Sequence, residues 1–265
     1  MTVVGYFCDP VTGGPARLEL LSIDGHAFQL LRSLEYRSDD HDEPFVFPVD
    51  LEHFRTDMAS VPSMFGWLVP RSGVFLPAAV LHDALTAYGD ESGPGAPAGD
   101  YRGPQVDRVE ADRLFRMAMG DLGTGRIRKW LMWAAVTLPT MWVAPRHRLW
   151  LRTVLVATLG IITVLGLLAT ADLVDLWNGL PWMGARPWWQ ELLGGAAGAV
   201  VVPALLALLW GRHRLAGLIA GWALAFLVHV TLAIIVIHTG YLIAERLVSG
   251  PRNHRFVHPG LRSGR

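Results

Sequence analysis

The chain has 265 residues, a length typical of about two domains, and its 23 Lys and Arg balance its 23 Asp and Glu. Residues 1–144 hold 12 basic and 19 acidic residues, a net charge of −7, whereas residues 145–265 hold 11 and 4, a net charge of +7. The acidic first part argues against nucleic acid as a partner, because such a footprint needs clustered cations that face phosphates. Cys8 is the single cysteine, which excludes an intramolecular disulfide and a thiolate metal cluster.

The first part of the chain begins with predicted strands. Apolar residues alternate over residues 16–36 on both sides of Asp24-Gly25, a two-residue turn signal, and this pattern predicts a β-hairpin. Residues 45–51 predict a further extended segment, in which Pro48 favours an edge position or a strand end.

Helical patterns follow. Residues 74–88 carry apolar side chains at the spacing of one helix face, with Pro77 in the first turn and Gly89 where a C-cap is expected. Residues 89–103 are rich in Gly and Pro and predict a flexible loop. The helical period resumes over residues 107–122 and again over 127–143, where Pro139 predicts a kink or an end. This order predicts an α+β amino-terminal domain, residues 1–145, with a small antiparallel sheet and about three helices.

The composition changes abruptly after this domain. Residues 153–171, 192–210 and 215–244 contain no Asp, Glu, Lys or Arg, and each meets the length of about 20 residues that a bilayer-crossing helix needs. They predict an all-α membrane region, residues 146–250, with three transmembrane helices, and a basic, flexible tail over 251–265. Buried helices of a large soluble domain are the less favoured alternative, because three such runs leave no polar face. The lipid bilayer is therefore an expected partner.

Arginine near the ends of the spans predicts the orientation of this integral membrane protein. Basic residues precede the first span and separate the second from the third, which places both borders, and the amino-terminal domain, in the cytoplasm (Arg146, Arg148, Arg152, Arg212, Arg214). Three spans would put the basic tail on the far side, against the same rule. Either the tail is an exception, which we favour, or the Trp-rich residues 130–143 enter the membrane, or residues 215–244 do not simply cross once.

Two features lie inside the predicted spans. Gly194, Gly195 and Gly198 give the second span a small-residue face suited to close helix contact. His229 and His238 lie in the third span, where ionisable groups are usually functional. Nine residues place these two histidines on nearly opposite faces of a helix, so a shared site is not expected.

The candidate chemistry lies in the amino-terminal domain. His82 and Asp83 are adjacent on a predicted helix, so their side chains point about 100° apart and have separate roles. Asp112, on the next helix, is the natural carboxylate to hold His82 in one tautomer as a general base. Asp83 would bind a hard cation together with oxygen ligands from Asp57 and its neighbours Thr56 and Ser60.

A purely structural interpretation accounts for the same residues with equal weight. Asp57 could cap the following turn, His82 could be a core histidine bonded to a backbone carbonyl, and Asp112 could cap a helix or pair with Arg116. Two other classes fit less well. A nucleophilic Ser60 lacks the Gly-x-Ser-x-Gly context, and a metal-dependent phosphohydrolase would need more nearby histidines than His53.

Three motifs together carry a resemblance to a known family. They are Phe-x-Thr-Asp-x-Ala-Ser-Val-Pro-x-x-Phe at 54–65, Ala-Ala-Val-Leu-His-Asp at 78–83 and Ala-Asp-x-x-Phe-x-x-Ala-Met at 111–119. This pattern resembles a domain-of-unknown-function family found in phage and prophage proteins, and it covers about the first 145 residues. The family has no settled activity. The Gly- and Pro-rich insertion and the membrane region depart from its short phage members.

A weaker resemblance is to the His-Asp helix pair of bacterial phospholipase A2 enzymes. It implies that His82 activates a water, that Asp112 orients the histidine, and that Asp83 with the Asp57 loop binds calcium. The chain departs from that family in lacking its disulfides and a Gly-rich calcium loop. The expected function is therefore a membrane-anchored, phage-derived hydrolase of lipid or other ester bonds, with any cofactor unknown and calcium the candidate. The alternative is a non-catalytic structural or protein-binding module at the membrane, with an unknown protein partner.

Overall fold

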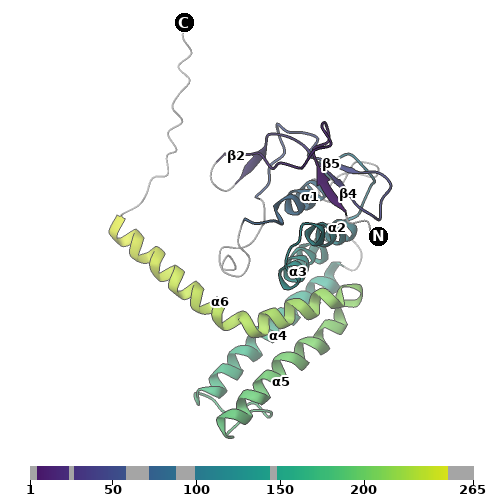
Figure 1. Cartoon of the computed structure of the whole chain (residues 1–265). Coiled ribbons are helices and arrows are strands. Elements are labelled where there is room, and N and C mark those ends of the chain that lie inside the picture. Colours follow the sequence, from purple (N-terminus) through teal and green to yellow (C-terminus); the bar gives the residue numbers. More distant parts are fainter. Residues whose placement is uncertain (1–4, 24–26, 58–71, 88–98, 144–147, 250–265) are drawn as a thin grey trace.

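The computed structural model describes residues 5–23, 27–57, 72–87, 99–143 and 148–249. Figure 1 shows short strands and three helices, α1 to α3, forming one unit, and the long helices α4 to α6 forming a second unit beneath it. The predicted fold class, an α+β part followed by long apolar helices, is confirmed. The predicted basic tail and the turn at Asp24-Gly25 lie outside the described residues.

Five short strands form two antiparallel sheets. The larger sheet has the order β1-β4-β5 and consists of Tyr6–Cys8, Leu34–Arg37 and Phe45–Phe47. The second pairs β2, Leu20–Ser22, with β3, Phe28–Leu30, and this confirms the predicted hairpin. Strand β5 lies at the sheet edge and Pro48 follows its last residue, as its missing N–H requires.

Three helices complete the amino-terminal unit: α1 (Leu76–Thr86), α2 (Arg108–Asp121) and α3 (Arg126–Val143). The Asp107 carboxylate caps α2 by accepting a hydrogen bond from the Glu110 N–H at 2.8 Å, an interaction typically worth about 1 kcal/mol. Pro139 does not end α3, which continues to Val143. Of the two outcomes predicted at Pro139, a kink or an end, the end is thus excluded, and the kink stays a prediction.

The core of this unit lies between the larger sheet and one face each of α1 and α2. The strands contribute mainly aromatic side chains, and the helices contribute mainly small or aliphatic ones. Those with almost no exposed surface include Tyr36, Phe45, Phe47, Phe75, Leu81, Leu85, Leu114 and Met119. The Tyr36 hydroxyl also donates a hydrogen bond to Asp121 at 2.7 Å, which joins β4 to the end of α2. This packing fixes α1 and α2 side by side.

Residues 99–103 return the chain to the core. The Asp100 N–H donates to the Ala84 carbonyl at 2.8 Å, and the Asp100 carboxylate accepts from the N–H groups of Val49 and Asp50 at 3.1 and 3.0 Å. This end of the Gly- and Pro-rich segment is therefore held against α1 and against the chain that follows β5, contrary to the flexible loop expected there. Most of that segment and the Gly89 cap lie outside the described residues.

The second unit contains α4 (Arg148–Leu173), α5 (Trp188–Ala207), the short 3-10 helix η3 (Leu208–His213) and α6 (Arg214–Ser249). Two stretches within the described residues are long and apolar enough to cross a membrane, Leu149–Leu173 and Trp188–Leu227. The second stretch passes through η3, where Gly211 has φ 55° and ψ −121°, so its backbone is not one continuous helix. The count of three spans stays a prediction.

Trp210 holds the corner between α5 and α6. Its side chain is 1% exposed, and its indole N–H donates to the Thr158 hydroxyl of α4 at 3.1 Å. Gly217 lies so close to the indole that an added Cβ would be 2.5 Å from the ring.

Small residues also allow close contact in α5, where a Cβ on Gly194 would be 2.1 Å from the Trp182 carbonyl oxygen. The predicted small-residue face therefore packs within the chain.

Candidate functional site

His82 and Asp112 meet between α1 and α2. The Nε2 atom of His82 lies 2.9 Å from Oδ1 of Asp112. Because an ionised carboxylate only accepts hydrogen bonds, Nε2 carries the proton and donates it. The His82 side chain is 12% exposed and that of Asp112 is 3% exposed, so solvent barely weakens the contact. The structure thus contains the predicted His-Asp pair, and Asp112 does not pair with Arg116.

The helix faces explain this meeting. Residues of α1 that are buried in the core flank His82, and Asp112 lies on the buried face of α2 with Ala111 and Phe115. The His82 ring packs on Phe115, with ring centroids 5.1 Å apart. Because Asp112 and Phe115 are three residues apart, they lie on one helix face and hold the imidazole from two sides. The ring is therefore fixed in tautomer and in orientation.

The second ring nitrogen of His82, Nδ1, makes no hydrogen bond to any residue that the structure describes. With Nε2 protonated, Nδ1 carries the basic lone pair. The pair is thus arranged so that Nδ1 can take a proton while Asp112 stabilises the imidazolium that results. His82 and Asp112 do not line the three main cavities that involve the described residues. The pocket expected beside the pair stays a prediction.

Asp83 points to a different neighbour, as its position next to His82 requires. The Thr56 hydroxyl donates to Oδ2 of Asp83 at 2.5 Å. Burial raises the pKa of Asp83 to about 6; the hydrogen bond from Thr56 and the charge of His82 oppose this rise, and the Asp57 carboxylate adds to it. Asp57 and Asp83 are therefore close enough for their charges to interact.

Whether Asp57 and Asp83 bind a metal stays a prediction. Their carboxylates and the Thr56 hydroxyl are hard oxygen donors, the type that calcium prefers, but calcium takes about six to eight oxygens. Among the described residues no group of three or more His, Cys, Asp and Glu side chains is placed to hold a metal ion. Ser60, the other expected ligand, lies outside the described residues.

The raised pKa of Asp83 predicts a pH dependence of stability. Between the unfolded value of 3.8 and the folded value of about 6, the folded chain binds a proton that the unfolded chain has lost. Asp83 therefore stabilises the fold below pH 4, and this contribution is lost as the pH rises through 6, by up to about 3 kcal/mol. We expect Asp83→Asn to raise the thermal midpoint of the full chain at pH 7.5 more than at pH 4.5.

Circular dichroism of the detergent-solubilised chain at the two pH values measures this difference. Asp42→Asn, at an exposed carboxylate, is the matched control and should change neither midpoint by more than about 1 °C. Equal shifts for Asp83→Asn at both pH values would contradict the assigned pKa.

His213 is a residue near the site that the sequence did not single out. It is buried in η3, accepts a hydrogen bond from Arg212 Nε at 3.1 Å, and interacts electrostatically with Asp112. Asp112 therefore interacts with two histidines, His82 in the amino-terminal unit and His213 in the unit of long helices. No sequence signal pointed to this, because Arg212 and Arg214 marked the segment only as a border between two spans.

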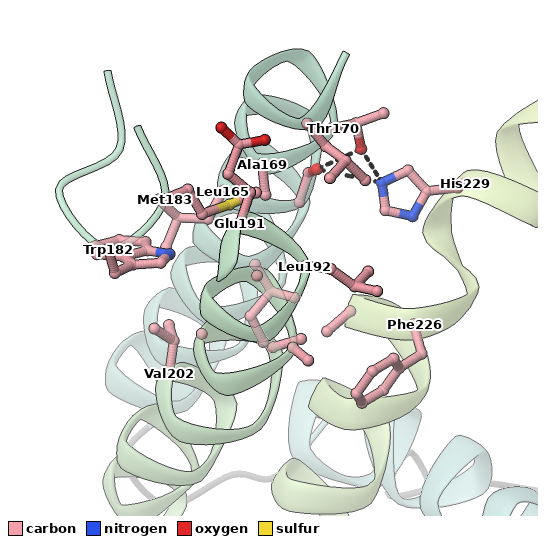
Figure 2. Close-up of a pocket in the computed structure, with 18 of the residues that line it drawn as sticks. Leu165, Ala169, Thr170, Trp182, Met183, Glu191, Leu192, Val202, Phe226 and His229 are labelled. Carbon is pink, nitrogen blue, oxygen red and sulfur yellow. Dashed lines mark hydrogen bonds between the residues drawn. The ribbon is translucent and has the colours of Figure 1, made fainter. Parts of the chain in front are cut away.

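A cavity of about 230 Å³ lies between α4, α5 and α6 (Figure 2). It is lined by Thr170, Glu191 and His229 among mostly apolar side chains. The Nε2 atom of His229 contacts the Thr170 hydroxyl and lies 3.2 Å from the Gly166 carbonyl oxygen. His238 is exposed on the far part of α6. As expected, the two histidines do not share a site, and the burial of Glu191 was not foreseen.

The fold and the pair define a small α+β domain with a buried His-Asp contact, joined to long apolar helices. Residues 28–136 match the model of a family described as "Protein of unknown function (DUF1353)". Both His82 and Asp112 lie within the matched residues. No curated protein and no solved structure matches the chain.

Proposed function

We propose that this chain is a membrane-anchored hydrolase of lipid or other ester bonds, with His82 as the general base. The single observation that carries this proposal is the 2.9 Å contact between His82 Nε2 and the buried Asp112 carboxylate, which leaves Nδ1 as the basic nitrogen. A structural core histidine would satisfy both nitrogens, whereas a base must keep one lone pair available, and Nδ1 has no hydrogen-bond partner among the described residues.

In this mechanism Nδ1 of His82 takes a proton from a water molecule as the water oxygen attacks the ester carbonyl. Asp112 stabilises the imidazolium, and the imidazolium then returns its proton to the departing alkoxide. A positioned base typically contributes a factor of about 10² to 10⁴ to the rate. A hard cation at Asp83 and Asp57, if bound, would polarise the carbonyl oxygen.

The apolar helices support a lipid substrate. Two stretches can cross a bilayer, and a chain anchored there would hold the His-Asp pair close to lipid esters. The arginines that precede the first predicted span and separate α5 from α6 favour a cytoplasmic amino-terminal domain. A phage origin, in keeping with the resemblance of the motifs, belongs to the same proposal.

The second candidate is a non-catalytic structural or protein-binding module. The observation that favours it is the low exposure of the His82 side chain, 12%, with its ring against Phe115. In that case the pair would link α1 and α2 as a buried polar contact. Substitution of His82 or Asp112 would then change the stability of the fold and no activity.

Hydrolysis by the full chain distinguishes the two candidates. We expect the chain, reconstituted in phosphatidylcholine vesicles, to release fatty acid from lipid or to cleave short-chain nitrophenyl esters. His82→Gln should lower kcat/KM by at least about 100-fold, because glutamine keeps a donor toward Asp112 but has no basic nitrogen. The same assays with calcium or with a chelator test the metal at Asp83.

His53→Gln is the matched control. His53 also bonds an aspartate, with Nδ1 2.8 Å from Oδ2 of Asp50, but its side chain is 79% exposed. This variant should keep full activity. Hydrolysis that survives His82→Gln would contradict the proposed base, and a folded chain that cleaves none of these esters would favour the non-catalytic module.

A further inference from the structure

The cavity between α4, α5 and α6 has a polar end and an apolar end. Thr170 and Glu191 lie in the last turns of α4 and the first turn of α5, next to the loop that joins these helices. Val202 and Pro203 line the cavity three turns further along α5, with Phe226 of α6. Figure 2 shows Thr170, Glu191 and His229 around one part of the cavity and Val202 and Phe226 in the other. An elongated amphiphile matches this division.

Glu191 is the notable group in this cavity. Its side chain is 4% exposed, and its Oε1 accepts one hydrogen bond, from the Arg186 N–H at 3.1 Å. The Arg186 guanidinium is engaged by the carbonyl oxygens of Trp182 and Pro181. Within the described part of the chain Glu191 therefore has no cationic partner. Burying a carboxylate without one is costly, and such groups normally meet a counter-charge.

The imidazole of His229, the second polar group at this end, lies against two oxygens of α4. The Thr170 hydroxyl donates to the Gly166 carbonyl at 2.8 Å, and Nε2 of His229 lies beside both oxygens. With those two oxygens as acceptors, Nε2 carries the proton and Nδ1 of His229 is left with a lone pair. Nε2 of His229 is thus engaged within the helices, and Glu191 is the group at this end that requires a hydrogen-bond donor.

The size of the cavity limits the ligand further. A volume of about 230 Å³ lies below the usual range for drug-sized ligands. That is room for part of one aliphatic chain and too little for the two chains of a phospholipid. Small residues of α4 and α5 create this space, among them Gly166, Gly195 and Ala199.

We propose that this cavity binds a single-chain aliphatic amine, with its ammonium group at Glu191 and its chain along Val202 and Phe226. The ammonium supplies both the donors and the positive charge that this end lacks. In a bilayer, the loop between α4 and α5 would lie near the polar surface and the apolar end of the cavity in the hydrocarbon interior. An aliphatic amine takes the same orientation in a membrane. This inference is independent of the proposed hydrolysis, because it concerns residues outside the matched family region.

Photo-labelling of the full chain in phosphatidylcholine nanodiscs tests the proposal. The probe is a twelve-carbon amine with a diazirine in its chain, and mass spectrometry maps the labelled residues. We expect label on cavity residues of α5 and α6, with dodecylamine competing at least 10-fold better than dodecanoic acid or dodecanol. Glu191→Gln should lower labelling at least 10-fold, since it removes the charge and keeps the acceptor for the Arg186 N–H.

A matched pair of variants tests the space itself. Ala199→Leu fills the cavity and should abolish the label, whereas Ala197→Leu, on an exposed position of the same helix that does not line the cavity, should leave it unchanged. Circular dichroism verifies the helix content of each variant. Equal competition by the acid, or full labelling of Glu191→Gln or Ala199→Leu, would overturn the proposal.

Discussion

Gly99→Ala is expected to destabilise the amino-terminal unit by about 3 kcal/mol or more, one of the two largest effects of a single substitution that we expect. A Cβ on Gly99 would lie 2.1 Å from the Ala84 carbonyl oxygen and 2.7 Å from the backbone of Leu85. These are backbone atoms at the end of α1, and they cannot move aside as a flexible side chain can. The adjacent Asp100 N–H bonds the same carbonyl oxygen, so relief of the clash would also break that contact.

Hydrogen–deuterium exchange of the full chain measures this effect in the affected unit. Amides of α1 and β5 should exchange at least about 100-fold faster in Gly99→Ala, which is the stability loss expressed as an equilibrium factor. Gly125→Ala is the matched control, because no atom lies within 4 Å of its added Cβ. Similar exchange in both variants would show that the chain does not pass this close to α1.

Trp210→Ala is expected to cost about 3 to 5 kcal/mol, the usual range for truncating a fully buried large aromatic side chain. The indole is 1% exposed, bonds Thr158 of α4 and presses on Gly217 of α6. Its loss would leave a hole where three elements meet, and the Thr158 hydroxyl would lose its partner. The corner between α5 and α6 should then open before the rest of the helices.

Thermal unfolding in a mild detergent, with limited proteolysis at residues 208–213, measures the change. Trp188→Ala provides the comparison, since that side chain is 72% exposed and its removal should cost less than about 1 kcal/mol in detergent. Trp210→Ala unfolding at the same temperature as Trp188→Ala would contradict the role assigned to the corner.

Local patterns in the sequence were sufficient to predict the helices and strands of the amino-terminal unit and the pairing of His82 with Asp112. The helical period over residues 107–122 predicted α2, and Pro77 marked the first turn of α1. Once both helices were placed, the burial of one face of each left few ways to pack them. His82 and Asp112 were then natural partners, and the adjacent Asp83 had to point elsewhere.

Other features depend on contacts between distant parts of the chain, which periodicity does not encode. Gly99 belonged to a Gly- and Pro-rich segment, and only the folded structure shows how close it lies to α1. Glu191 was one acidic residue at the start of an apolar run, and its burial depends on the loop that packs over it. His213 acquires its interaction with Asp112 because η3 returns the chain to the amino-terminal unit.

The length of α6 has a consequence for how the chain would sit in a bilayer. Its 36 residues span about 54 Å at about 1.5 Å per residue, whereas the hydrocarbon layer is about 30 Å thick. An upright α6 would therefore project well beyond the lipid tails, and burying more of it would require a steep tilt. The part that extends away from α4 and α5 in Figure 1 carries exposed Val236, Ile237 and Tyr241. The tilt of α6 in a bilayer would therefore decide whether these side chains lie in lipid or in water.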